Sequence, residues 1–230
     1  MTIEAMAFDK DGTLLDFQAT WGGWAVDLVQ RMTAGDAAMQ GAIADALALD
    51  MANRSVRPGS VVIAGTARDI AQKLEAIDGL PDVGNLADYL IEQSLEVTAV
   101  PLVPLVPFFN DLRSRGLALG VVTNDAHAAM QGQLAALDIA HLFDFVAGYD
   151  SGFGAKPDPD PCLAFAAHVG KDPARCAMVG DSLHDLVAGK AAGMVAIGVT
   201  SGLAPREELA AVADVVLDDI TQIPAWLDAR

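Results

Sequence analysis

Outside residues 16–100, the hydrophobic residues of this chain fall into short, mostly apolar runs separated by stretches of helical periodicity. The apolar runs cover residues 3–8, 117–122, 143–147, 176–179, 194–199 and 213–217. Runs of this length are typical of strands that are buried on both faces. Helices are predicted near residues 108–115, 126–137, 183–192 and 223–228, and in a stretch that ends at residue 169. Strand and helix alternate, which predicts an α/β fold with a Rossmann-like, mostly parallel sheet between layers of helices.

Residues 16–100 follow a different pattern. From Thr20 the apolar side chains recur at helical spacing, and Ala- and Leu-rich segments continue over about residues 36–53, 66–77 and 85–97. Because no convincing strand pattern interrupts them, we predict an all-helical domain of residues 16–100, inserted into a core of residues 1–15 and 101–230. The proline-rich residues 100–107 are expected to form a stiff return connection, since proline fixes φ.

Polar residues follow four of the predicted core strands at the point where each strand ends. These residues are Asp9 and Asp11, Thr123 and Asn124, Lys156, and Asp181 and Asp185. Ligands of parallel α/β sheets bind beyond the carboxyl ends of the strands, so these side chains are expected to meet at one site.

Asp9 and Asp11 come directly after the first strand, and Gly12 lets the chain turn there. Two neighbouring carboxylates repel each other, and a bound divalent cation removes that repulsion. Carboxylate oxygens suit Mg²⁺. Taken alone, the same residues also fit a surface turn rich in Asp and Gly.

The four polar segments together resemble a known family. Residues 8–14 (FDKDGTL), 121–124 (VVTN), 156–159 (KPDP) and 180–185 (GDSLHD) are similar, in this order, to the four motifs of the haloacid dehalogenase-like (HAD) superfamily of phosphohydrolases. The similarity extends over the whole chain and is greatest to the phosphoglycolate phosphatase group. It implies a Rossmann-like catalytic core, and it implies that residues 16–100 are a helical cap that closes over the active site.

The resemblance also implies a role for each polar residue. Asp9 would be the nucleophile that forms an aspartyl-phosphate, and Asp11 the general acid and base. Thr123 would donate its hydroxyl, and Asn124 its backbone amide, to the phosphoryl oxygens. Lys156 would stabilise the nucleophile and the phosphoryl group.

The metal site implied by the resemblance holds Mg²⁺. Its ligands would be Asp9, Asp181 and the backbone carbonyl of Asp11, with Asp185 either a further ligand or a residue that orients waters and Lys156. Lys10, between the two aspartates, is expected to point away from both carboxylates, and we assign it no catalytic role. Thr123 also fits a helix N-cap, a role compatible with phosphate binding; Asn124 or Asp125 could cap the following helix.

Composition narrows the choice of partners. The formal net charge of −17 argues against nucleic acid, because phosphate backbones require clustered Lys and Arg. No apolar run reaches the roughly 18 residues that span a bilayer. With 2 cysteines and no signal-peptide pattern, a reducing cytoplasm is the simplest location. We expect a small phosphorylated metabolite as partner, no membrane, and a monomer or homodimer.

Within residues 16–100, two sets of side chains have more than one interpretation. Trp21 and Trp24 fit a hydrophobic core better than a substrate-stacking pair. Arg54, Arg57 and Arg68 are the candidate anion contacts, although exposed arginines need no such role.

The expected activity is hydrolysis of a small phosphate monoester with Mg²⁺, with phosphoglycolate favoured as substrate. A phosphosugar mutase shares the aspartyl-phosphate step and differs in what captures the intermediate. A haloalkanoate dehalogenase fits less well, because that chemistry does not need Asp11 or the metal carboxylates. A binding or regulatory protein on this scaffold is the alternative from another class, although no motif residue is missing.

Overall fold

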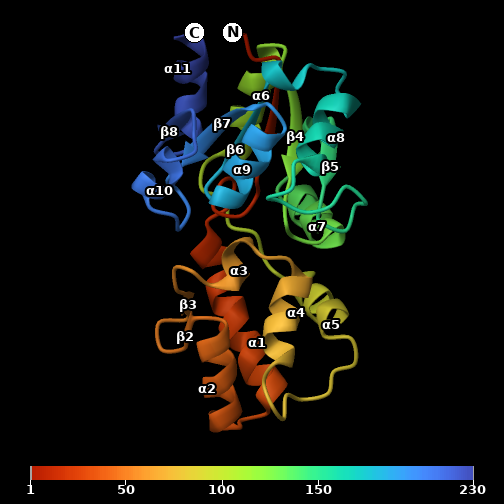
Figure 1. Cartoon of the computed structure of the whole chain (residues 1–230), viewed down its shortest axis with the longest axis vertical. Helices are drawn as coiled ribbons and strands as arrows, with labels where there is room; N and C mark the ends of the chain where they lie inside the picture. Colours follow the sequence, from red (N-terminus) through yellow and green to blue (C-terminus); the bar gives the residue numbers. More distant parts are fainter. Residues whose placement is uncertain (1, 230) are drawn as a thin grey trace. The chain divides into compact units, whose positions relative to one another are not determined.

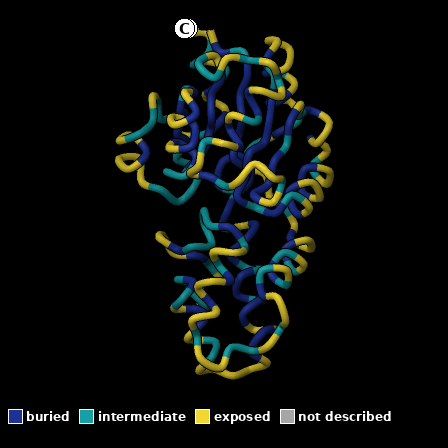
Figure 2. The backbone as a smooth tube through the Cα atoms, turned by 45° about the vertical axis from the view of Figure 1, so that its right-hand side comes forward, coloured by how far each residue is buried: buried dark blue, intermediate teal, exposed yellow. Residues whose placement is uncertain are grey.

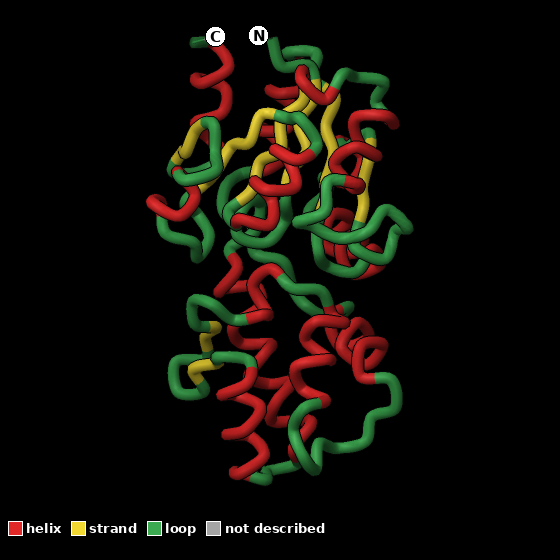
Figure 3. Tube along the Cα trace, viewed as in Figure 1, coloured by secondary structure: helices red, strands yellow, loops and turns green. Residues whose placement is uncertain are grey.

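The computed structural model describes residues 2–229, which divide into two compact units (Figure 1). One unit comprises the residues up to Asp16 together with those from Pro101 onward, and the other comprises Phe17–Val100. The first unit has the alternating strands and helices of an α/β fold, and the second is mainly helical (Figure 3).

A six-stranded parallel sheet forms the centre of the first unit. Its strands are β1 (Ala5–Phe8), β4 (Ala118–Val122), β5 (Phe145–Ala147), β6 (Cys176–Gly180), β7 (Val195–Val199) and β8 (Val215–Leu217). The strand order is β5-β4-β1-β6-β7-β8, with every neighbouring pair parallel. The predicted Rossmann-like sheet is confirmed, and each strand coincides with an apolar run of the sequence, with β6 extending one residue further, to Gly180.

Helices cover both faces of this sheet. They are α6 (Leu105–Ser114), α7 (His127–Ala136), α8 (Asp160–His168), α9 (Leu183–Ala191), α10 (Arg206–Ala210) and α11 (Ile223–Asp228), with short 3₁₀ turns at Ala140–Leu142, Pro173–Arg175 and Ile220–Gln222.

The central strand β1 shows why its sequence is apolar throughout. On one face, Ala5 and Ala7 belong to a buried cluster with residues of α8 and α9. On the other face, the Phe8 ring lies edge-on to Phe108 and Phe109 of α6, with ring centroids 6.1 and 5.3 Å away. A strand with a helix on each side has no polar face, and the inner strands β4, β1, β6 and β7 are accordingly almost entirely buried, whereas the edge strand β8 is only partly buried (Figure 2).

One boundary of the core differs from the prediction. Helix α6 begins at Leu105, inside the segment expected to be a proline-rich connection, and Pro107 lies in its first turn. Proline is tolerated there because the first backbone N–H groups of a helix have no intrahelical partner.

The second unit contains helices in each of the predicted segments, together with a short helix, α3, and a hairpin that were not predicted. A turn of π-helix (Gln18–Gly22) leads into α1 (Gly23–Thr33), followed by α2 (Ala37–Ala46), α3 (Val61–Ala64), α4 (Ala67–Glu75) and α5 (Leu86–Ser94). Between α2 and α3, the strands β2 (Leu49–Asp50) and β3 (Ser55–Val56) pair antiparallel, so the unit is not entirely helical.

The reason for this hairpin is local. The Asp50 carboxylate accepts hydrogen bonds from the backbone N–H groups of Ala52 and Asn53 and so closes the turn. Ala48 and Arg54 adopt left-handed backbone conformations on either side. Strands of two residues leave no periodic signal in a sequence, which is why the helical pattern concealed them.

The tryptophan pair and the candidate arginine Arg54 have structural roles inside the second unit. Trp21 is buried and packs edge-on against Trp24, with ring centroids 5.1 Å apart, and the Trp24 indole donates to the Gln93 carbonyl. Arg54 forms an ion pair with Asp27 at 2.7 Å. The preferred assignment of the tryptophans to a core is consistent with this packing.

None of the helices formed by residues 2–229 combines the length and the apolar character that a membrane-spanning segment requires.

Candidate active site

The sheet brings the ends of β1, β4 and β6 to one place. Phe8 of β1 is in register with Val121 of β4 on one side and with Val179 of β6 on the other. The residues that follow these strands therefore emerge side by side at the carboxyl edge of the sheet, where ligands of such folds bind. Asp9, Thr123 and Asp181 lie there.

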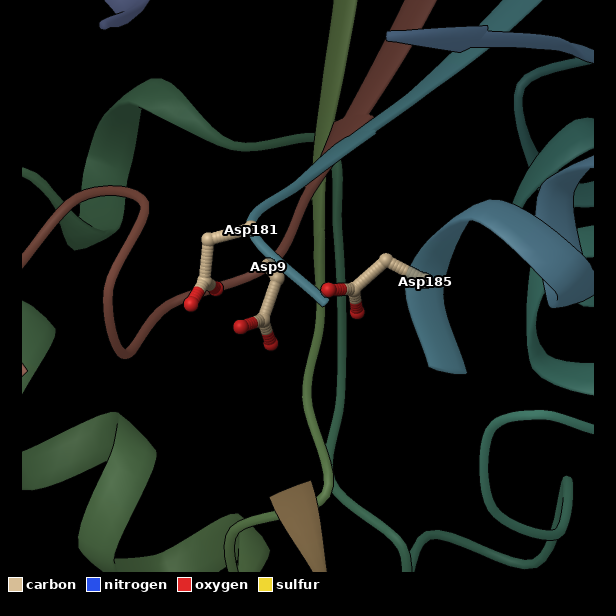
Figure 4. Close-up of side chains that lie close together, drawn as sticks. All are labelled: Asp9, Asp181 and Asp185. Carbon is tan, nitrogen blue, oxygen red and sulfur yellow. The ribbon is translucent and has the colours of Figure 1, made fainter. Parts of the chain in front are cut away.

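Three buried carboxylates form the acidic group of the site. Asp9, Asp181 and Asp185 each offer one oxygen, and these three oxygens lie within 4.8 Å of one another. Figure 4 shows the side chains converging from β1, β6 and the start of α9. Burial is the main cause that raises the pKa of Asp9 to about 7 and the pKa of Asp181 well above its ordinary value. Ionising these buried carboxylates together is costly, and a bound divalent cation would offset that cost. The group is therefore a candidate site for such a cation.

Lys156 supplies a positive charge in this group. Its Nζ lies 2.6 Å from Asp9 Oδ1 and 2.6 Å from Asp185 Oδ1, and its side chain is buried. Burial alone would lower the pKa of Lys156, but Asp185 and Asp9 outweigh it and raise that pKa above its usual range. Lys156 is therefore a fixed ammonium group between the two carboxylates.

Asp185 is engaged through both of its oxygens. Oδ1 pairs with Lys156, while Oδ2 accepts hydrogen bonds from the Ser182 backbone N–H at 3.0 Å and from the Ser182 hydroxyl at 2.7 Å. These contacts anchor the start of α9 and orient Lys156. Of the two roles left open for Asp185, they favour the orienting one.

Thr123 and Asn124 follow β4 and are buried. The Thr123 hydroxyl oxygen accepts a hydrogen bond from Asp125 N–H at 3.1 Å, which leaves its own proton for a ligand. The Asn124 side chain makes two hydrogen bonds to the backbone of Lys156, with Nδ2 donating to the carbonyl at 2.8 Å and Oδ1 accepting from the amide at 2.9 Å. Asn124 thus holds the lysine loop, a role that the sequence did not reveal.

The expected cap of the helix after β4 was wrong. Helix α7 begins at His127, and neither Asn124 nor Asp125 is its N-cap. The His127 backbone N–H instead donates to the Asp150 carboxylate from the loop after β5, at 2.8 Å. Asp125 is turned toward another partner, Lys10.

Comparison with known proteins agrees with this geometry. The family model of haloacid dehalogenase-like hydrolases matches residues 3–193. The chain belongs to this family. Among curated proteins, it is 38% identical over 113 residues to the phosphoglycolate phosphatase of Salmonella paratyphi A, covering 49% of this chain and 45% of that protein. It is 44% identical over 91 residues to the phosphoglycolate phosphatase of Escherichia coli K12, covering 40% of this chain and 36% of that protein.

Solved structures resemble the fold over nearly the whole chain. CbbY from Rhodobacter sphaeroides, crystallised with phosphate, aligns with a TM-score of 0.73 at 22% identity, covering 99% of this chain and 100% of that one. A HAD family hydrolase from Deinococcus radiodurans, with bound phosphate and sodium, aligns with a TM-score of 0.67 at 21% identity, covering 99% of this chain and 96% of that one. The matches to the two curated phosphatases, by contrast, span less than half of those proteins.

The HAD signature contains one side chain whose placement was wrongly expected. Lys10 does not point away from both carboxylates: its Nζ lies 2.6 Å from Asp11 Oδ2. The expectation assumed an extended chain, in which side chains alternate. The chain turns instead, with Leu14 and Leu15 donating to the Lys10 carbonyl and Gly12 at a φ of +84°.

A fifth loop, which sequence reasoning missed, completes the HAD site. Ser201 follows β7, and its hydroxyl donates to the Gly12 carbonyl at 2.8 Å. Gly202 lies so close to Asp181 that a Cβ atom at either Gly12 or Gly202 would collide with the Asp181 carboxylate. The position of Ser201-Gly202 just beyond an apolar run was the available signal, since β7 ends at the same edge of the sheet as the other motifs.

The Mg²⁺ site proposed below gives Gly202→Ala a definite expected effect: weaker Mg²⁺ binding, because the added methyl group must displace the Asp181 carboxylate. Disturbing the surroundings of a metal ligand typically costs about 10- to 100-fold in affinity, and we expect a loss of that size. Calorimetric titration with Mg²⁺ measures it. Gly132→Ala is the matched control, because nothing lies within 4 Å of a Cβ atom at that position in α7. Equal Mg²⁺ affinities in the two variants would contradict the inference that Gly202 leaves the space in which the Asp181 carboxylate lies.

Proposed function

We propose that this chain is a Mg²⁺-dependent phosphatase that hydrolyses a small phosphate monoester through an aspartyl-phosphate on Asp9. The observation that carries the proposal is Lys156, whose ammonium group is held 2.6 Å from both Asp9 and Asp185 within a buried carboxylate group. This arrangement keeps a carboxylate nucleophile next to a fixed positive charge, as attack on a negatively charged phosphoryl group requires.

Two proton transfers accompany the proposed reaction. An Asp9 oxygen attacks phosphorus, the bond from phosphorus to the leaving oxygen breaks, and the Asp11 carboxyl gives that oxygen its proton. Asp11, now a carboxylate, then takes a proton from the water that attacks the aspartyl-phosphate. The bond between phosphorus and Asp9 breaks, and inorganic phosphate leaves.

The other residues bind and neutralise the phosphoryl group in this proposal. The Thr123 hydroxyl and the Asn124 backbone amide donate to its oxygens, and Lys156 offsets its charge. Asp9, Asp181 and the backbone carbonyl of Asp11 would hold Mg²⁺, with Asp185 beside them. The chemistry that the ion supplies when bound is neutralisation of the charge shared by the substrate and the carboxylates.

Phosphoglycolate is the favoured substrate because the curated relatives named above are phosphoglycolate phosphatases. The four motifs recognise a phosphoryl group and do not read the rest of the ester, so another small phosphate ester would serve the same chemistry. The role of residues 16–100 as a cap that selects the substrate stays a prediction.

A phosphate-release screen tests this proposal. Purified protein is incubated with phosphoglycolate, sugar phosphates and other small phosphate esters, with and without Mg²⁺. We expect release of inorganic phosphate only with Mg²⁺, and fastest from phosphoglycolate. A clear preference for another ester would replace the substrate and leave the chemistry intact. No release from any ester, by protein shown to bind Mg²⁺, would overturn the phosphatase and favour a mutase or a binding protein.

A further inference from the structure

Lys10 lies at the centre of a second buried polar cluster, beside the acidic group. Its Nζ is 2.6 Å from Asp11 Oδ2, 3.2 Å from Asp125 Oδ2 and 2.6 Å from Gln133 Oε1. Asp125 belongs to the loop after β4, and Gln133 to α7. Two other segments of the core therefore meet the loop after β1 at one lysine whose side chain is entirely buried.

The charge on Lys10 is fixed by these neighbours. Burial, the largest effect, would lower the pKa of Lys10, but Asp11 and Asp125 together raise it above its ordinary value. Lys10 is thus a buried ammonium group that faces two carboxylates and an amide oxygen. Such a cluster is a weak source of stability, because the cost of removing charges from water can exceed their attraction. Its presence calls for another explanation.

The partner that gives the cluster a function is Asp11. Asp11 follows Asp9 by two positions, yet it is absent from the group of described carboxylates that lie within 4.8 Å of one another, which comprises Asp9, Asp181 and Asp185. One Asp11 oxygen is held instead by Lys10, and Lys10 is held in turn by Asp125 and Gln133. General acid catalysis depends on placing the acid within hydrogen-bond reach of the reacting oxygen, so a carboxylate with a fixed orientation has a direct catalytic value.

We propose that Lys10 is a positioning residue, which holds the Asp11 carboxyl group where it serves the leaving oxygen, while Asp125 and Gln133 hold Lys10. This inference rests on the proposed phosphatase function. Lys10 itself transfers no proton: the proton passes from Asp11 to the leaving oxygen as the bond to phosphorus breaks. Loss of Lys10 should therefore slow the reaction only to the extent that the reaction depends on Asp11.

A double-mutant cycle tests this dependence. Lys10→Met, Asp11→Asn and the double variant are assayed on an alkyl phosphate, whose leaving oxygen needs a proton, and on 4-nitrophenyl phosphate, whose leaving group needs little help. General acid catalysis contributes about 10²- to 10⁴-fold, and we expect Lys10→Met to lose about 10- to 100-fold in kcat on the alkyl ester and much less on the aryl ester. In the Asp11→Asn background, Lys10→Met should cause no further loss.

Two comparisons separate positioning from a structural effect. Lys190→Met makes the same substitution on α9, where Lys190 forms an exposed ion pair with Asp214. Its effect on kcat should not depend on the leaving group. Gln133→Met leaves every charge in place and removes one contact of Lys10, so it should give a smaller loss with the same preference for the aryl ester. It also replaces Lys10→Met in the assay if that variant does not fold. Equal losses on both esters, or equal losses with and without Asp11, would overturn the proposal.

Crystal structures of the wild type and of Lys10→Met, or of Gln133→Met if the former does not fold, provide a readout that needs no turnover. We expect the Asp11 carboxyl group to leave its present position or to take two orientations in the variant. An unchanged Asp11 would overturn the positioning role whatever the activity. A wild type that hydrolyses no ester would contradict the proposed function alone, since the position of Asp11 is measured independently.

Discussion

Asp9→Asn should abolish phosphate release, lowering kcat by about 10⁴-fold or more, as expected when a covalent nucleophile is removed. An amide is a poor nucleophile toward phosphorus, while its shape matches that of the carboxylate it replaces. The fold should survive, because burial raises the pKa of Asp9 to about 7 and so makes the ionised carboxylate costly in the folded protein. The amide removes that cost and can still accept a hydrogen bond from Lys156.

The measurement combines phosphate release with detection of the intermediate. Wild-type protein quenched in acid during turnover should carry a phosphorylated Asp9, seen by mass spectrometry of its peptides, and Asp9→Asn should carry none. Asp111→Asn is the matched control, since Asp111 of α6 is an exposed carboxylate that pairs with Arg115, just after the helix. Turnover by Asp9→Asn above about one hundredth of the wild-type rate would exclude Asp9 as the nucleophile.

The sequence predicted the position of the site better than the contacts within it. Buried parallel strands require continuous apolar runs, so the ends of β1, β4 and β6 could be located, and with them Asp9, Thr123 and Asp181. Strand order and register then fix which ends are neighbours. That order is known only from the structure; the expectation that Asp9, Asp181 and Asp185 share one site rested on the resemblance to the HAD motifs, and the structure places the three carboxylates together.

The hydrogen bonds that hold the site residues in place join residues that are far apart along the chain. No local sequence pattern encodes them. Lys10 meets Gln133 on α7, and Ser201 meets the Gly12 carbonyl. Asn124 fixes the backbone of Lys156 with its side chain, although the sequence analysis expected only a helix cap or a backbone amide that binds the phosphoryl group. Each of these contacts depends on how loops from different strands pack together, which only the folded chain determines.

Removal of Mg²⁺ should have the second largest effect on turnover, after the loss of Asp9. A chelator should stop turnover, and added Mg²⁺ should restore it, because Asp9, Asp181 and Asp185 then lack the cation that offsets their charge. Mg²⁺ should also stabilise the fold. At about 100 times its Kd, a ligand that binds only the folded state contributes about 2.7 kcal/mol, which raises the Tm of a chain of this size by roughly 5–10 °C.

The stabilisation by Mg²⁺ should depend on pH with a definite sign. The pKa of Asp9 is about 7 in the metal-free fold, above its ordinary value of 3.8, so the folded state binds more protons than the unfolded state between those values. The contribution of Asp9 to the stability of the metal-free protein is therefore complete below pH 3.8 and is lost as pH rises through about 7. Mg²⁺ requires ionised carboxylates, so its stabilising effect should grow over the same range.

Thermal unfolding with and without Mg²⁺ at pH 5.5 and pH 8 measures this linkage. The increase in Tm should be larger at pH 8, and Asp181→Asn should lose most of it at both pH values while remaining folded, because burial also raises the pKa of Asp181 and the amide avoids that cost. Lys156 cannot substitute for the ion, since its ammonium group already pairs with Asp9 and Asp185. An equal Tm increase at both pH values, or an undiminished increase in Asp181→Asn, would mean that Mg²⁺ binds elsewhere on this acidic protein.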